Sequence, residues 1–223
     1  MLDDLAYGHP VAFASVHVED IRHIGADDLA FARQLGYRIK LLGLARMTDD
    51  GLQARVTPCL VPQHAPLAQV DGVFNAVVAE GEFVGRIMVE GRGAGAGPTA
   101  SAVTADLVDL ARGQAITLWG VQSGTVEPVR ACPISAGEAA FYLRLRVEDR
   151  PGVIADITAV LRDCGVSLRS MLQHPADSET APHVPLVLVT HRTSEAAMQA
   201  AIAQIDALSV VTDTPVMIRI EAA

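Results

Sequence analysis

The sequence has few of the features that mark secreted, membrane or disulfide-rich proteins. Its three cysteines, Cys59, Cys132 and Cys164, are odd in number and far apart in a chain of 223 residues, a pattern that fits neither a disulfide framework nor a zinc site. No apolar run is long enough to span a membrane. Asp3 and Asp4 stand where a secretory signal would carry positive charge. We therefore expect a cytoplasmic protein with no membrane segment and no targeting peptide.

Positive charge is also scarce. Lysine and arginine number 17 against 26 acidic residues, so the formal net charge is −9. This balance argues against a surface that binds nucleic acid or an anionic membrane. One group of possible metal ligands, His17, Glu19 and His23, is close in sequence. We interpret the spacing of these residues as placing them on no common face of a helix or strand. We therefore expect no metal site.

What the chain does have is a glycine-rich segment at residues 90–102, Glu-Gly-Arg-Gly-Ala-Gly-Ala-Gly-Pro-Thr-Ala-Ser-Ala. Glycine lets a ligand approach the main chain closely. Pro98 suits a first helical turn, and Val103, Leu107 and Leu110 recur at helical spacing, which predicts a helix over residues 98–111. The free N–H groups at such a helix start can hold an anionic ligand. A tight strand-to-helix turn is the alternative interpretation.

The pattern before residue 113 predicts a mostly antiparallel sheet with helices on one face. A short strand is expected at residues 11–16, and a helix capped by Asp27 or Asp28 runs to Leu35, where Gly36 can end it. Turn signals separate two pairs of apolar segments, residues 37–47 with 52–60 and residues 73–79 with 83–89. Four strands in two hairpins would form this sheet.

The pattern after residue 140 predicts a βαββαβ order. Strands are expected at residues 142–147, 166–173, 185–190 and 216–220, and two helices at 153–161 and 197–208, the second capped by Thr193 or Ser194. Such a unit is a ferredoxin-like sandwich. The glycine- and proline-rich stretch between the halves has no sustained period and indicates connecting structure. The fold class is therefore α+β, with domains at residues 1–112 and 141–223 and a linker at 113–140.

Residues 141–220 resemble an ACT domain, a small regulatory module that binds amino acids. The segment that carries the resemblance is Arg-Val-Glu-Asp-Arg-Pro-Gly-Val-Ile-Ala-Asp-Ile at residues 146–157, which follows the family's order of strand, Asp-x-Pro-Gly-Val and helix. The resemblance implies that an amino-acid effector binds near the start of that helix. Its candidate contacts are Asp149, Pro151, Gly152, Val153, Ser170 and Gln173. For Gln173, an exposed strand position without a ligand is an open alternative.

Residues 1–112 resemble the C-terminal part of the catalytic region of homoserine dehydrogenase. Six segments in the family's order carry the resemblance: Leu-Ala-Tyr-Gly at 5–8, Gly-Tyr-Arg-Ile-Lys-Leu-Leu at 36–42, Val-Thr-Pro at 56–58, Pro-Leu-Ala-Gln-Val at 66–70, Phe-Asn-Ala-Val at 74–77, and the glycine-rich segment at 91–102. A following ACT domain matches the long bacterial form of that enzyme. The family reduces aspartate semialdehyde to homoserine with NAD(P)H, on the branch toward threonine and methionine.

The sequence departs from the family at its N-terminal side. The family begins with a Rossmann domain, and no G-x-G-x-x-G follows an N-terminal strand here. The family's catalytic aspartate and lysine lie upstream of the part equivalent to residues 1–2. The resemblance therefore implies that this chain supplies no catalytic residue, binds no NAD(P) by itself and is inactive alone. The alternative function is a stand-alone amino-acid-binding and dimerisation module.

The resemblance also assigns candidate residues in the first half. The loop Gly93, Ala94 and Gly95 is similar to the family segment that approaches the nicotinamide, and Thr99 can bond a ligand or simply begin a helix. Two further residues each have two possible roles. Lys40 either faces a substrate cleft or extends from a strand edge to solvent. Glu90 either holds a substrate ammonium or ends a strand.

Two kinds of partner follow from the resemblance and the composition. Threonine, the pathway end product, is the expected effector. A homodimer or higher homo-oligomer is expected because the first sheet lacks a second covering layer and because ACT domains commonly pair their sheet edges, which covers the open edge strands. Neither nucleic acid nor a membrane is an expected partner.

Overall fold

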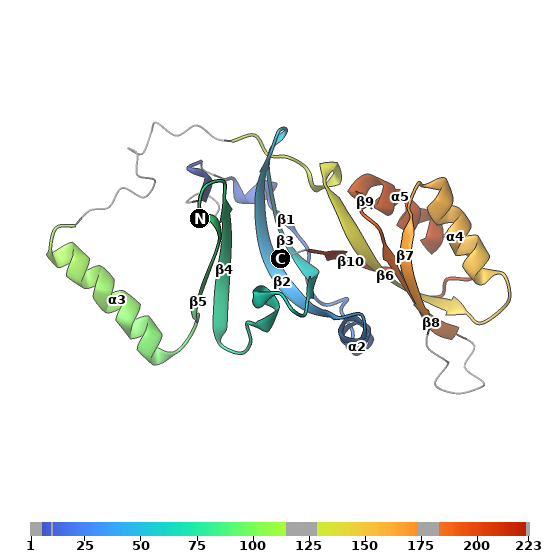
Figure 1. The fold of residues 1–223 in the computed structure, drawn as a ribbon, viewed down its shortest axis with the longest axis horizontal. Helices are drawn as coiled ribbons and strands as arrows, with labels where there is room; N and C mark the ends of the chain where they lie inside the picture. Colours follow the sequence, from blue (N-terminus) through green and yellow to red (C-terminus); the bar gives the residue numbers. More distant parts are fainter. Residues whose placement is uncertain (1–5, 10, 115–128, 174–182, 222–223) are drawn as a thin grey trace. The chain divides into compact units, whose positions relative to one another are not determined.

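The computed structural model describes residues 6–9, 11–114, 129–173 and 183–221. Its contacts divide the chain into two compact units (Figure 1). One unit combines residues 12–62 with 130–222, and the other contains residues 63–129 with the first eleven residues. The units therefore cut across the sequence-based domains, because residues 12–62 pack with the C-terminal half of the chain.

The larger unit is built on one eight-stranded sheet. Its strands are β1 (His17–Val18), β2 (Tyr37–Thr48), β3 (Gly51–Pro62), β6 (Glu138–Glu148), β7 (Leu168–Gln173), β8 (His183–Thr190), β9 (Thr193–Ser194) and β10 (Val216–Ile220). The order β1-β3-β10-β6-β8-β7 makes β3 and β10 neighbours, with Arg219 opposite Cys59. Strand β2 pairs with β3 along its full length, and β9 pairs with the start of β6. The sheet thus runs from the first half of the chain into the second without a break.

The C-terminal part of this unit has the expected βαββαβ order. Helices α4 (Val153–Asp163) and α5 (Glu195–Asp206) connect β6 to β7 and β8 to β10. Both helices pack on one face of the sheet through a core that includes Phe141, Leu143, Ile157 and Ile205, all fully buried. This core holds the ferredoxin-like fold together, since alternate residues of β6 point into it.

The other face of the same sheet is covered by α2 (Ala26–Gln34), a helix from the first half of the chain. Phe31 and Ala32 of α2 pack against Tyr142, Val187 and other residues that alternate with those of the first core. Helices therefore lie on both faces of this sheet. The α+β class is confirmed, and the first-half helix occupies a face that α4 and α5 leave open.

The smaller unit contains a separate two-stranded sheet and a helix. Strands β4 (Phe74–Gly81) and β5 (Gly85–Arg92) form an antiparallel hairpin, and α3 (Ala96–Ala111) follows. The expectation that all four first-half strands form one sheet is therefore wrong. The reason is that β3 finds β1 and β10 as neighbours on the edge that β2 leaves free. A hairpin pattern in the sequence predicts which two strands pair with each other, but it does not predict which hairpins combine into one sheet.

Some of the helix caps and short elements differ from those that the local sequence predicts. Helix α2 begins after Gly25, and Asp28 closes the capping box by accepting a hydrogen bond from the Gly25 N–H at 2.9 Å, so neither aspartate is the cap itself. Ser194 caps α5, as expected, by accepting from the N–H of Ala197. Residues expected as a strand at 11–16 form instead a short 3₁₀ turn, Phe13–Ser15. Similar turns occur at Pro66–Gln69 and Ile134–Ala136.

The linker expected at 113–140 is only partly described. Residues 115–128 lie outside the described part of the chain, but residues 130–132 bond to β3 through Leu52, and β6 already begins at Glu138. Within the described residues, no helix is long and apolar enough to cross a membrane.

Candidate functional site

The glycine-rich segment forms a tight turn between β5 and α3. The Gly93 N–H donates a hydrogen bond to the carbonyl of Val73 at 2.9 Å. A Cβ at Gly93 would stand 1.7 Å from Nδ2 of Asn75, and Gly95 has φ +129°. The backbone conformation therefore favours glycine at position 95, whereas a side chain at position 93 would require the exposed side chain of Asn75 to move.

Helix α3 begins at Ala96, two residues before the expected start. Its first turn presents main-chain N–H groups, and Thr99 lies there with its own N–H bonded to the Gly95 carbonyl at 3.1 Å. A helix start of this kind attracts anions. The turn geometry accounts for Gly93 and Gly95 without a ligand, so both interpretations of the segment, ligand loop and tight turn, fit its shape.

The two candidate substrate-side residues lie in different units. Lys40 is a half-buried residue of β2, opposite Cys59 on β3. Glu90 is an exposed residue of β5, opposite Ala76 on β4. Because Lys40 belongs to the larger unit and Glu90 to the smaller one, the structure defines no common site for them.

The candidate effector turn is open at its centre. Gly152 has φ +95° and caps the start of α4, and a Cβ placed there would meet no atom within 4 Å. The next residue, Val153, is buried in the core below the turn. Pro151 and Asp149 are at the exposed side of the turn. A small ligand can therefore reach the N–H groups at the start of α4.

Ser170 and Gln173, the other two candidates, lie on β7 but on opposite faces of the sheet. Gln173 pairs with Leu186, whose side chain is in the core beneath α4 and α5. Ser170 pairs with Val189, two residues after Val187 of the α2-side core. Directly opposite residues share a face of the sheet. The structure therefore places Gln173 on the α4 side with Gly152 and does not bring Ser170 to that side within one chain.

A buried carboxylate that the sequence did not reveal ties α2 to β6. Asp28 is fully buried and accepts hydrogen bonds from the Tyr142 hydroxyl at 2.9 Å and from Nε and Nη2 of Arg144 at 2.6 and 3.1 Å. With the Gly25 N–H, four donors satisfy the two oxygens. The sequence pattern predicted a strand at residues 142–147, which includes Arg144, but nothing in that pattern identified the partner of this arginine.

A second buried network surrounds Arg219 of β10. Its Nε and Nη2 donate to Glu195, the first residue of α5, at 3.0 and 2.6 Å, and its Nη1 donates to Glu19 at 2.8 Å. The side chain of Arg219 is 2% exposed and that of Glu195 is 4% exposed. A third pair, Arg55 with Glu221, is also nearly buried. An arginine within an apolar strand was the only sequence signal for this network.

The pKa values follow from these contacts. Burial alone would raise the pKa of Glu19, but hydrogen bonds from His17 and Arg219 outweigh it and lower the pKa. Burial raises the pKa of Tyr142, and the carboxylate of Asp28 raises it further. Burial also raises the pKa of the Cys59 thiol to about 11, so that thiol is protonated at neutral pH.

Of the three residues His17, Glu19 and His23, whose spacing predicted no common face, the structure brings the first two together. Nε2 of His17 lies 2.8 Å from Oε1 of Glu19, because residues two apart in extended chain point the same way. The Glu19 carboxylate is engaged by Arg219, however. Among the described residues, no group of three or more histidine, cysteine, aspartate or glutamate side chains is arranged to hold a metal ion.

Two family models match separate parts of the chain. Residues 1–108 match the family model for homoserine dehydrogenase, and residues 141–209 match the model for the ACT domain. Homoserine dehydrogenases from Pseudomonas aeruginosa and Neisseria gonorrhoeae are 39% and 37% identical over 227 and 228 aligned residues. These alignments cover 99% and 100% of this chain but 52% of each relative.

Solved structures give the same result. A homoserine dehydrogenase from Thiobacillus denitrificans superposes with a TM-score of 0.87 at 40% identity, over 99% of this chain and 51% of that one. A homoserine dehydrogenase from S. aureus, at 23% identity and a TM-score of 0.64, shares the fold. The chain thus spans about half the length of the relatives it matches. It belongs to the homoserine dehydrogenase family, with the homoserine dehydrogenase domain followed by an ACT domain.

Proposed function

We propose that this chain supplies the C-terminal, substrate-side and regulatory half of a homoserine dehydrogenase. The whole enzyme interconverts aspartate semialdehyde and homoserine with NAD(P), in threonine and methionine biosynthesis. The observation that carries the proposal is similarity over 99% of this chain to about half of each relative. The turn at Gly93 to Gly95, with the start of α3 behind it, is the part best suited to approach the cofactor.

Turnover measurements test this half-enzyme proposal. The 223-residue chain alone should oxidise homoserine with neither nicotinamide cofactor, because hydride transfer needs the cofactor domain and acid–base groups positioned together. A fusion that places the other half of the Thiobacillus denitrificans enzyme before this chain should gain turnover. Turnover by the chain alone would contradict the proposal. An inactive but folded fusion would favour the stand-alone binding and dimerisation module.

The proposed effector is threonine, bound at the turn of residues 149–152. Its carboxylate suits the N–H groups at the start of α4, and Asp149 or the amide of Gln173 offers acceptors for its ammonium. The open space at Gly152 and the position of Gln173 on the α4 side support this. Calorimetry of Gln173→Ala should show threonine binding weakened by about 1 kcal/mol or more. Ser170→Ala, on the opposite face, is the matched control and should bind unchanged.

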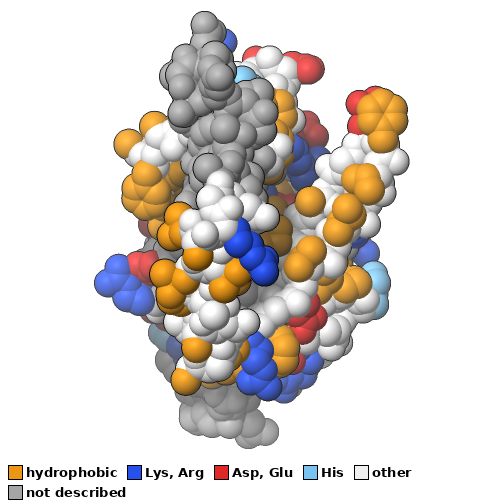
Figure 2. Space-filling view, turned by 90° about the vertical axis from the view of Figure 1, so that its left-hand side faces the viewer, with side chains coloured by type: hydrophobic (Ala, Val, Ile, Leu, Met, Phe, Trp, Pro, Cys, Tyr) orange, Lys and Arg blue, Asp and Glu red, His pale blue; other side chains and the backbone are white. Residues whose placement is uncertain are grey.

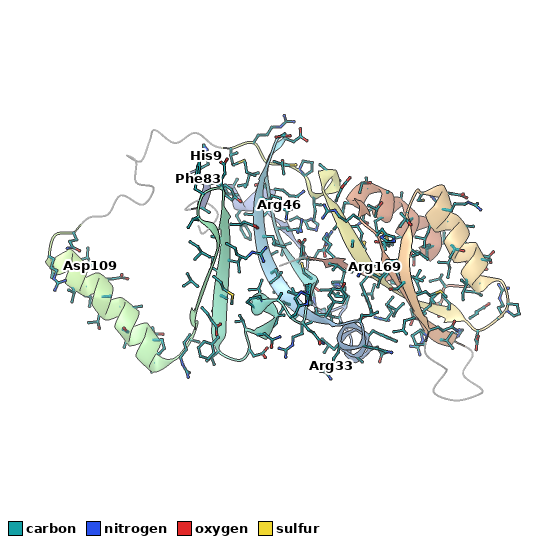
Figure 3. All side chains as sticks on the ribbon, viewed as in Figure 1. His9, Arg33, Arg46, Phe83, Asp109 and Arg169 are labelled. Carbon is teal, nitrogen blue, oxygen red and sulfur yellow. The ribbon has the colours of Figure 1, made fainter. Side chains whose placement is uncertain are left out.

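The proposed assembly is a homodimer or a higher homo-oligomer. A two-stranded hairpin such as β4–β5 is marginally stable alone, and hydrophobic side chains (orange) are exposed on the face shown in Figure 2. The exposed apolar side chains of the smaller unit include Val77, Val89, Leu107 and Leu110. Phe83 is 98% exposed, and Figure 3 labels it at the tip of the β4–β5 hairpin. Light scattering at micromolar concentration should give at least twice the chain mass. A monodisperse monomer would contradict this part of the proposal.

A further inference from the structure

Two ionic clusters join parts of the chain that match different families. Asp28, in the homoserine dehydrogenase match, binds Arg144 in the ACT match. Glu19, also in the first match, binds Arg219 on β10, the last strand of the βαββαβ fold. Each cluster therefore crosses the boundary between the two families' domains.

The two clusters lie on opposite faces of the shared sheet. Arg144 lies two residues after Tyr142 on β6, so the two side chains point to the same face of the sheet, the face that packs against α2. Arg219 alternates with Ile218 and Ile220, which pack on the α2 side, and so points to the side of α5, where Glu195 receives it. The sheet is thus held to residues 12–62 from both of its faces.

Separating residues 12–62 from the rest of the sheet would break buried or partly buried contacts in both clusters. Asp28 is fully buried, and its partner Arg144 has a side chain 18% exposed. Moving α2 away from β6 would leave that arginine without its carboxylate and would expose the apolar contacts of Phe31 and Ala32. Opening would break the hydrogen bonds that Asp28 accepts from Tyr142 and Arg144 and would lose the apolar packing of α2, and both losses cost free energy. Neither half of the unit can therefore open at low cost while the other remains closed.

We propose that the ACT fold of this protein is not a tethered module but one cooperative body with residues 12–62, clamped through Asp28 on one face of the sheet and Arg219 on the other. A change in the ACT sheet is then also a change in α2 and β3. This inference goes beyond the proposed function and does not depend on which effector binds.

Amide hydrogen exchange of the full 223-residue chain, followed at increasing sub-denaturing guanidinium, tests the clamp. The slowest amides of α2 and β3 should share one opening free energy and one denaturant dependence with those of β6 and β8. In the double variant Asp28→Asn with Glu19→Gln, amides of α2 and β3 should exchange at least tenfold faster than those of β6 and β8. The control Asp163→Asn removes an exposed pair with Arg162 and should leave the four elements coincident.

Two outcomes would overturn the proposal. One is a wild-type chain in which α2 and β3 already exchange more than tenfold faster than β6 and β8. The other is a folded double variant in which all four elements still open together, since the clusters would then not carry the coupling. If the double variant does not fold, Glu19→Gln alone gives the comparison, because it leaves Arg219 bidentate on Glu195.

Discussion

The carboxylate of Asp28 accepts a hydrogen bond from the hydroxyl of Tyr142 at 2.9 Å, across 114 positions of sequence. One residue belongs to the homoserine dehydrogenase match and the other to the ACT match. The bond joins α2 to the middle of β6, inside an otherwise apolar cluster. Polar contacts of this kind fix one arrangement of packed elements, because an unsatisfied buried group is expensive.

Tyr142→Phe should destabilise the chain by about 1–2 kcal/mol, because a hydrogen bond to a charged group is lost while the carboxylate keeps Arg144 and the Gly25 N–H. The ring itself stays and still fills the core. Urea unfolding, with the midpoint compared at equal slope, gives the value. An unchanged midpoint would mean that the hydroxyl contributes nothing to the attachment of α2.

Gly93→Ala should disturb the turn between β5 and α3. The added Cβ would overlap the side-chain amide of Asn75, so this exposed side chain would have to leave its position in the turn. Amide exchange over residues 74–92 should accelerate. Adding Asn75→Ala should restore most of the protection by removing the clashing group.

The matched control for that variant is Gly91→Ala, where a Cβ would meet no atom within 4 Å. It should leave the exchange of the hairpin unchanged. Equal effects of Gly91→Ala and Gly93→Ala would contradict the contact-based explanation.

The Glu19 contacts should make stability depend on pH. The pKa of Glu19 in the folded chain is lowered from 4.5, so its ionised form contributes stability that is fully present above about pH 4.5 and is lost as the pH falls through the lowered pKa. The difference in unfolding free energy between wild type and Glu19→Gln should therefore be constant near neutral pH and shrink below pH 4.5. Urea titrations between pH 7 and 3 measure it. A difference that grows on acidification would contradict the assignment.

Local patterns in the sequence predicted the C-terminal fold well. The alternating residues of β6 and the helical spacing of α4 placed both elements, and β10 was predicted at its observed bounds, Val216–Ile220. These elements were predictable because their burial repeats with the period of their secondary structure. The turn before α4 was also predicted from Pro151 and Gly152, and in the structure Gly152 caps that helix with φ +95°.

The joining of the two halves could not be predicted. β3 and β10 pair over a separation of 160 positions, Cys59 with Arg219, and strand patterns carry no signal for such pairing. Asp28 was interpreted as a cap because an aspartate near a helix start usually is one. Its bonds to Tyr142 and Arg144 depend on tertiary packing. The same holds for Glu19, whose partner Arg219 is 200 positions away.

Calorimetric titration of the 223-residue chain with threonine tests the regulatory half of the account most directly. The wild-type chain should bind threonine, and Gly152→Val should abolish binding by blocking the start of α4. Gly165→Val is the matched control, since Gly165 follows the other end of the same helix with φ +71° and open space around its Cβ, so it carries similar backbone strain and should still bind. Absence of threonine binding by the wild type, or unchanged binding by Gly152→Val, would contradict the account.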